Sequence, residues 1–324
     1  MFTLRFDMRA PDWAAPAADL YAAAIDMCAW AETHGAILGV LSEHHGADDG
    51  HLPVPLILAS AIAARTTQLA ILIAAVPIPL WDPVRLAEEM SVLDLISKGR
   101  VLYALGIGHR REEYDHFGSS MATRGAVADE IMAVLGGLVR GEAVEYRGRR
   151  VRVTPACASA SGPVMMIAGG SRAAARRAAV HGLGFISQTA SPDLKEFYEI
   201  QCRAAGHEPG AVQFPVSDAP TVVFVADDVD EAWSTLGPHL LHDAVTAASY
   251  RPHDDSVASI TRADNVAELR AAESPYRIVS VDEAVEYIRS GRPLPLHPLC
   301  GGVAPDVAWR HLELAGTASA RAQK

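Results

Sequence analysis

Three short stretches contain the residues whose types and spacing could do chemistry. The first, SEHHG, places Glu43, His44 and His45 directly after the apolar run AILGVL. An imidazole titrates near neutral pH and can move protons during a reaction. These groups could also bind a metal ion, but adjacent side chains at a strand end point in opposite directions, so we predict no shared metal. The pair is equally compatible with one histidine bonding a nearby backbone and the other facing solvent.

The other two stretches place glycines at strand ends. GIGHR puts Gly106 and Gly108 after the run VLYAL, where the missing side chains allow a flat ring or a backbone to approach closely. AGGSR puts Gly169, Gly170 and Ser171 between a strand and a helix. The free N–H groups, the hydroxyl and the helix dipole of such a turn suit a phosphate. A tight turn with an ordinary N-cap serine is the alternative.

Composition excludes several classes of protein. The net charge of −11, without a dense basic stretch, argues against nucleic acid or an anionic membrane as partner. No leader-like segment or long apolar run is present, which predicts a cytoplasmic protein. The sequence contains no GxSxG motif of a serine hydrolase and no GxGxxG motif of a dinucleotide-binding domain. Four cysteines without a CxxC pair indicate reduced thiols and no zinc site: Cys28, Cys157, Cys202 and Cys300.

Apolar runs that predict strands alternate with helix signals. The strands are expected at 2–6, 36–41, 69–76, 101–106, 164–168, 183–187, 221–226 and 298–301. Between two of them, Asp82 is a typical N-cap, Pro83 a typical first helical residue and Gly99 a stop. Similar signals predict helices over 19–33, from Pro192 to Gly206, and from Pro305 to about residue 315, with a frayed tail, TASARAQK, after it.

Eight strands followed by helices, with right-handed crossovers, predict an α/β fold that closes into a TIM (β/α)8 barrel. An open doubly wound sheet is the competing architecture. We expect one domain over 1–324, with a hairpin at 145–153. An insertion at 227–296, before the eighth strand, is expected to form helices over the mouth of the barrel.

Together these stretches resemble the bacterial luciferase-like monooxygenase family of flavin-dependent oxidoreductases. The resemblance covers nearly the whole chain. It rests on SEHH, on DPVRLAEEMSVLDLISKGR with the following GIG and EEYDHFG, on AGGS, and on HPLCGGVAPDVAW. It implies a TIM barrel, usually dimeric, with a flavin or deazaflavin bound at the C-terminal ends of the strands.

The resemblance also implies roles for single residues. His44 matches the catalytic histidine, which handles protons beside the flavin, and Glu43 matches a residue near its ring. Ala74 and Ala75 fall where many members have a cis peptide bond against the ring face.

The phosphate contacts implied by the resemblance lie further along the chain. Arg124 falls where luciferases use an arginine for the flavin phosphate, and Ser171 with Gly169 and Gly170 matches the phosphate loop. His109 stands where a luciferase arginine would be. This departure leaves the phosphate contacts and the type of flavin open.

The resemblance favours a two-component monooxygenase that uses reduced FMN and O2 on a small-molecule substrate. A separate flavin reductase would supply the reduced cofactor, and a homodimer is expected. One alternative is hydride transfer from a reduced deazaflavin, coenzyme F-420. Another is a flavin-binding paralogue or subunit without catalysis. The 227–296 segment, with His239, His242 and Tyr250, could form a lid, or a helical cover with solvated histidines.

Overall fold

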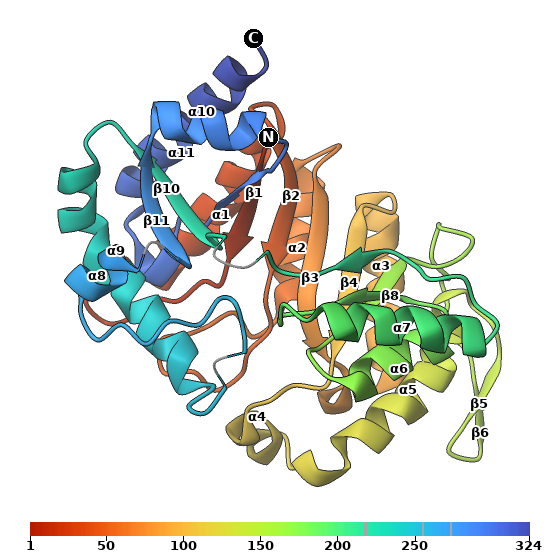
Figure 1. Cartoon of the computed structure of the whole chain (residues 1–324). Helices are drawn as coiled ribbons and strands as arrows, with labels where there is room; N and C mark the ends of the chain where they lie inside the picture. Colours follow the sequence, from red (N-terminus) through yellow and green to blue (C-terminus); the bar gives the residue numbers. More distant parts are fainter. Residues whose placement is uncertain (217–218, 255, 273) are drawn as a thin grey trace. The chain divides into compact units, whose positions relative to one another are not determined.

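Parallel strands connected by helices build both of the units into which the chain divides (Figure 1). The computed structural model describes residues 1–216, 219–254, 256–272 and 274–324. Unit 1 consists of Met1–Pro53, Arg65–Ala70 and Val216–Lys324. Unit 2 consists of Val54–Ala64 and Ile71–Pro215.

The sheet of unit 1 has the strand order β11-β10-β12-β1-β2, and every pair is parallel. Its strands are β1 (Phe2–Phe6), β2 (Ala36–Leu41), β10 (Val222–Ala226), β11 (Tyr276–Ser280) and β12 (Leu294–Leu296). Leu4 pairs with Gly39 on one side and with Leu296 on the other, so β1, β2 and β12 end at the same edge. The residues that follow these strands therefore lie close together.

Helices cover this sheet. They are α1 (Ala17–Glu32), α8 (Val229–Ser249), α9 (Val266–Ala271), α10 (Val281–Arg289) and α11 (Pro305–Ala322). Helices α10 and α11 pack against each other beside β10, as Figure 1 shows. The core beneath them is apolar, and Phe2, Leu4 and Phe6 of β1 are fully buried.

The sheet of unit 2 is also parallel, with the order β3-β4-β7-β8-β9. Its strands are β3 (Ala70–Pro77), β4 (Val101–Gly106), β7 (Val164–Ala168), β8 (Gly184–Ile186) and β9 (Val212–Gln213). Its helices are α2 (Pro55–Arg65), α3 (Pro83–Ser97), α4 (Arg111–His116), α5 (Arg124–Val139), α6 (Arg172–Val180) and α7 (Pro192–Ala204). The predicted hairpin is confirmed as the antiparallel pair β5 (Val144–Tyr146) and β6 (Arg149–Val151).

The cap signals place helix ends correctly. The Asp82 carboxylate accepts hydrogen bonds from the backbone N–H groups of Val84 and Arg85, at 2.9 and 3.1 Å, and α3 begins at Pro83. Lys98 and Gly99 then take left-handed conformations that end the helix. Seven of the predicted strands are also found, with ends that differ by at most one residue.

The predicted eighth strand is wrong. Residues 298–301 are not a strand, because Pro298 has no N–H to donate and Gly301 has a left-handed φ of 58°. Cys300–Gly302 instead forms a short 3-10 turn, and the strand lies earlier, at β12. A side chain at Gly301 would come within 2.2 Å of the carbonyl oxygen of His239 in α8, so this turn packs directly on the helix.

Two further expectations need correction. The 227–296 segment contains helices, as expected, but it also contains β11 and β12. The predicted frayed tail is part of α11, which continues to Ala322. Ala318 and Ser319 are buried there, and the Ser319 hydroxyl accepts a hydrogen bond from the amino group of Met1 at 3.1 Å, so tertiary contacts hold the last turns in place.

Candidate active site

The loop after β2 is closed by hydrogen bonds on both sides of His44. The backbone N–H of His44 donates to the carbonyl of Leu52 at 3.0 Å, and the N–H of Leu52 donates to the carbonyl of Asp7 at 2.8 Å. Ser42 Oγ lies 2.9 Å from Nε2 of His51, and both side chains are buried. The loop that carries the candidate catalytic residues is therefore fixed to the end of β1.

His44 and His45 take part in different interactions, as the strand geometry predicts. The half-buried His44 ring has its centroid 4.4 Å from the His51 ring and 5.5 Å from the Tyr250 ring. His45 Nε2 lies 3.1 Å from Oε1 of Glu43, whose side chain is buried. The Glu43 carboxylate thus pairs with His45, while the His44 ring packs among other aromatic rings.

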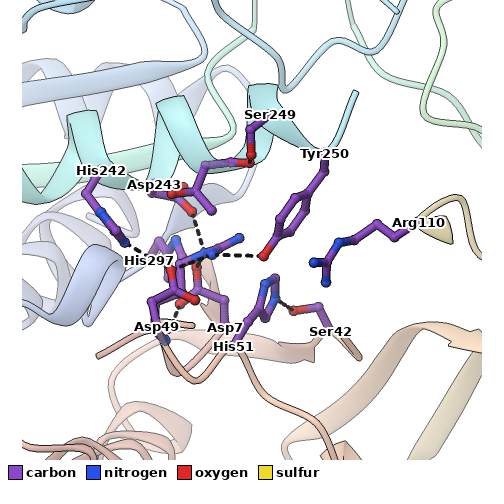
Figure 2. Close-up of polar contacts among 12 residues, drawn as sticks. Asp7, Ser42, Asp49, His51, Arg110, His242, Asp243, Ser249, Tyr250 and His297 are labelled. Carbon is purple, nitrogen blue, oxygen red and sulfur yellow. Dashed lines mark hydrogen bonds and ion pairs between the residues drawn. The ribbon is translucent and has the colours of Figure 1, made fainter. Parts of the chain in front are cut away.

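Arg9 is the centre of a buried charge network that the sequence did not reveal. It is 1% exposed and lies between three carboxylates. Its Nη1 is 2.6 Å from Oδ2 of Asp49, and its Nε is 3.2 Å from Oδ1 of Asp243 and 3.3 Å from Oδ2 of Asp7. Figure 2 shows these three carboxylates converging, with Tyr250 beside them. The Tyr250 ring also lies 5.3 Å from the Arg9 guanidinium carbon, a cation–π contact.

Helix α8 brings its polar side chains to this network. His242 Nε2 is 2.9 Å from Oδ2 of Asp49, and the Tyr276 hydroxyl donates to Oδ2 of Asp243 at 2.7 Å. His239, one turn earlier, bonds the Gly301 carbonyl at 2.8 Å. The part of 227–296 singled out in the sequence therefore contacts the loops after β1 and β2, within unit 1.

The network fixes the charge of its members. Burial alone would raise the pKa of Asp7, but His297 and Arg9 outweigh it and hold that pKa well below its ordinary value. Burial would lower the pKa of Arg9, and the surrounding carboxylates raise it instead. Burial, helped by Arg9 and His44, lowers the pKa of His51 well below its ordinary value. Asp7 is therefore ionised and His51 neutral at physiological pH.

A potential metal-binding group lies beneath this network. Single ligand atoms of Asp243, His297 and Cys300 come within 4.8 Å of one another, and all three residues are buried. However, Arg9 and Tyr276 already contact the two oxygens of Asp243. Burial and Asp243 also raise the pKa of the Cys300 thiol well above its ordinary value. A cation at this position would be repelled by the arginine, so we assign no metal to the group.

In unit 2, the ends of β3, β4 and β7 form a cradle of small residues. The peptide bond between Ala74 and Ala75 is cis, as the resemblance implies. A side chain at Gly106 would come within 3.2 Å of the Ala75 methyl group and 3.9 Å of the Ala168 methyl group. Gly108 has a left-handed φ of 66°, and a side chain there would come within 3.5 Å of the Tyr114 ring. The Tyr114 hydroxyl donates to the carbonyl of Ile107, which fixes this turn.

The predicted phosphate loop also has the expected local structure. Ser171 caps α6, and its hydroxyl accepts a hydrogen bond from the N–H of Ala174 at 3.3 Å. A side chain at Gly170 would come within 2.3 Å of Thr189 Oγ1, so only glycine fits there. Gly169 donates its N–H to the carbonyl of Ile186 at 3.0 Å, which ties the loop to the next strand.

Arg124, the first residue of α5, has one hydrogen-bond donor for which no described residue provides an acceptor. Its Nη1 donates to the carbonyl of Met121 at 2.7 Å, whereas its buried Nε has no hydrogen-bond partner among the described residues. Arg177, in the last turn of α6, donates to the carbonyl of Gly125 at 3.2 Å and so links α6 to the start of α5. The half-buried His109 lies in the turn between β4 and α4, where the resemblance leads one to expect arginine.

The candidate residues are thus divided between the two units. Glu43 and His44 lie in unit 1. The others lie in unit 2: Ala74, Ala75, Gly106, Gly108, His109, Arg124, Gly169, Gly170 and Ser171. The sequence reading missed Arg9, Asp243 and His297. Two of these follow buried strands: His297 comes directly after β12, and Arg9 is the third residue after β1.

Known proteins share both sequence and fold with this chain. The profile of the luciferase-like monooxygenases matches residues 6–285. The alkanal monooxygenase alpha chain of Photorhabdus luminescens is 28% identical over 151 residues, which are 45% of this chain and 42% of that protein. The chain spans only 38–42% of the length of the first curated relatives it matches. Within the described ranges, no helix combines the length and the apolar character needed to cross a membrane.

Two solved structures resemble the whole chain. Monooxygenase RslO1 from Streptomyces bottropensis has a TM-score of 0.77 at 20% identity and covers 100% of both chains. The oxygenating constituent of 3,6-diketocamphane monooxygenase from Pseudomonas putida, solved in complex with FMN, has a TM-score of 0.74 at 18% identity and covers 99% of this chain and 98% of its own. These likenesses show the fold, the α/β TIM-barrel class expected from the sequence. With the family profile matching residues 6–285 of 324, the chain belongs to the luciferase-like monooxygenase family.

Proposed function

We propose that the protein is a flavin-dependent monooxygenase that uses reduced FMN and O2 on a small organic substrate. A separate flavin reductase would supply the reduced FMN, since the sequence contains no dinucleotide fingerprint. The observation that carries this proposal is the match of the family profile to residues 6–285, together with the local structure of unit 2.

The residues of unit 2 fit a flavin phosphate. The buried Nε of Arg124 has no hydrogen-bond partner in the described part of the chain, and an anionic oxygen would satisfy it. Ser171 offers a hydroxyl at the start of α6, where the helix dipole favours an anion. These groups would hold the phosphate. The small residues Ala74, Ala75 and Gly106 would leave room for the flat ring system.

The bound reduced flavin would supply the electrons that activate O2. The protein would contribute proton transfer and exclusion of water. We propose that His44 holds or donates the proton in this reaction, because an imidazole changes charge near neutral pH and this ring is only half-buried. Glu43, paired with His45, would orient the same loop. The Tyr250 ring would shield His44 from water.

The presence of His109 supports a second candidate function. An imidazole in place of an arginine removes a permanent cation from the implied phosphate contacts. A deazaflavin, coenzyme F-420, carries different phosphate groups, and it would act by hydride transfer without O2. His44 would then have a different role.

We also propose that the protein forms a homodimer. Ile57 of α2 is 70% exposed, and Val92, Leu95 and Ile96 of α3 are each more than 40% exposed. Large apolar side chains exposed along one helix, as on α3, are typical of an interface between subunits. Light scattering would give the mass in solution, and a monomer over the whole micromolar range would contradict this proposal.

Anaerobic titration tests the proposed function directly. The purified protein is titrated with reduced FMN and separately with reduced deazaflavin, and each mixture is then combined with oxygenated buffer while spectra are recorded. Saturable FMN binding and a transient spectrum unlike that of reduced or oxidised flavin would support the monooxygenase. Deazaflavin binding with indifference to O2 would replace it with the hydride-transfer enzyme. Flavin binding without any turnover would indicate a non-catalytic paralogue.

A further inference from the structure

His51 and His44 lie on one loop that folds back on itself. Ser42 and His51 flank His44 in the sequence, and Ser42 Oγ lies 2.9 Å from His51 Nε2, a contact drawn in Figure 2. His51 is 4% exposed, so this contact is shielded from water. The backbone bond from His44 to Leu52 holds the two sides of the loop together.

The side chain of His51 forms one wall of the space that holds the His44 ring. The two ring centroids are 4.4 Å apart, with the planes inclined by 55°. Tyr250 provides a second wall, with its centroid 5.5 Å from that of His44. The rings of His51 and Tyr250 are nearly parallel, inclined by 17°. The His44 ring therefore lies against two fixed aromatic surfaces.

The hydrogen bonding of His51 determines its protonation. Its Nδ1 is buried and has no hydrogen-bond partner among the described residues. A buried ring N–H without an acceptor is less tolerated than a buried, unprotonated ring nitrogen without a donor. The proton of the neutral His51 ring is therefore assigned to Nε2, which donates it to Ser42 Oγ. A second proton would have to lie on Nδ1, where nothing accepts it.

We propose that His51 is a positioning residue for His44: Ser42 fixes the His51 ring, and that ring in turn holds the ring of His44. This inference rests on the proposed function only in assigning the proton-handling role to His44. Charged and titratable groups surround His51 on several elements: Arg5, Asp7, Arg9, His44 and Tyr250. Burial, Arg9 and His44 lower the pKa of His51, so the His51 ring stays neutral while it contacts the His44 ring.

Nuclear magnetic resonance of the flavin-free chain tests the positioning without any reaction. The Cε1–H signals of the histidines are followed between about pH 5 and 9, and His44→Gln assigns the signal of His44. In the wild type, the His51 signal should not titrate. In His51→Ala, the midpoint of the His44 titration should move by about half a unit or more. Identical His44 titrations in the two proteins would overturn the proposal.

Flavin reoxidation adds a kinetic test. The rate at which O2 reoxidises bound reduced FMN is measured across the same pH range. His51→Ala should slow this rate by about tenfold or more, because the ring of His44 loses its fixed position, and the FMN dissociation constant should stay unchanged. His51→Phe restores the ring surface and should recover most of the rate, while Ser42→Ala should cause a smaller loss.

A surface variant controls for general effects of removing an imidazole. The ring of His34, on the surface of unit 1, stacks on the ring of Trp30, with 3.8 Å between the ring centroids. The variant His34→Gln should behave like the wild type. If His51→Phe is as slow as His51→Ala, ring contact is not what positions His44. If the wild type binds no flavin, the proposed function fails, and the His44 titration in His51→Ala still decides the positioning role.

Discussion

Replacing Arg9 with methionine should destabilise the protein severely. Methionine has similar length and fills the space, but it leaves Asp7, Asp49 and Asp243 without the cation that lies 2.6–3.3 Å from them. Removing one partner of a buried ion pair costs about 3–5 kcal/mol. The three losses do not add, because His242, His297 and Tyr276 retain contacts with these carboxylates, so we expect about 3–5 kcal/mol in total at pH 8.

The pH dependence distinguishes charge from packing. In the wild type, the pKa of Asp7 in the folded state is lower than its ordinary value. Ionised Asp7 therefore contributes to the free energy of unfolding above the ordinary carboxyl pKa of about 3.9, and this contribution is lost as pH falls through the folded-state pKa. Burial is the largest influence on the pKa values of Asp7 and Asp49, so without Arg9 we expect both pKa values to rise above the ordinary carboxyl value. These carboxylates would then bind protons on folding, and the loss of unfolding free energy caused by Arg9→Met would grow as pH rises. Arg9→Met should therefore be less destabilising at pH 5 than at pH 8.

Urea unfolding followed by circular dichroism measures this difference in flavin-free protein. Arg9→Lys is the matched control, because it keeps the positive charge but loses the planar guanidinium group. It should lower the free energy of unfolding by less than Arg9→Met does. A loss below about 1 kcal/mol for Arg9→Met, or equal losses at both pH values, would refute the reasoning.

Three further predictions concern single residues. Arg124→Gln should weaken FMN binding by about 1.5–3 kcal/mol and leave riboflavin binding unchanged, because only FMN carries the phosphate; equal losses for both ligands in calorimetry would place the phosphate elsewhere. His44→Ala should leave FMN affinity nearly unchanged and slow coupled turnover by about 100-fold, and an unchanged rate would remove His44 from the chemistry. Burial would raise the pKa of Glu32, but bonds from the backbone N–H groups of residues 67–69 lower it to about 2. Glu32→Gln should therefore cost about 1–2 kcal/mol at pH 7 and less as pH falls from about 4 towards 2; a cost that does not change with pH in urea unfolding would contradict this.

Local signals in the sequence predicted much of the fold. A cap such as Asp82, followed by Pro83, acts within one helical turn, so the start of α3 could be placed from neighbouring residues alone. The family resemblance added the Ala74–Ala75 cis bond, which no local pattern indicates. The α/β class followed from the alternation of buried strands with helices.

The errors involved contacts between distant parts of the chain. Residues 298–301 are apolar enough for a strand, but Pro298 and the left-handed Gly301 prevent one, and Cys300–Gly302 forms a 3-10 turn that packs on His239. The end of α11 is polar and looks frayed, yet Ser319 bonds the amino group of Met1. The network around Arg9 could not be predicted, because its partner Asp243 lies on a helix far along the sequence, and pairing of single charges leaves no periodic pattern.

The division of the chain into units has a consequence for its synthesis. Unit 1 is built from residues on both sides of unit 2, so a ribosome completes unit 2 before it has made Asp243 and Tyr250. Until then, Arg9 has only its early partners, Asp7 and Asp49, and the strands β10, β11 and β12 are missing from the sheet. Strand β1 should thus be among the last elements to gain protection, and a nascent chain stalled before residue 222 should expose β1 to proteases and chaperones.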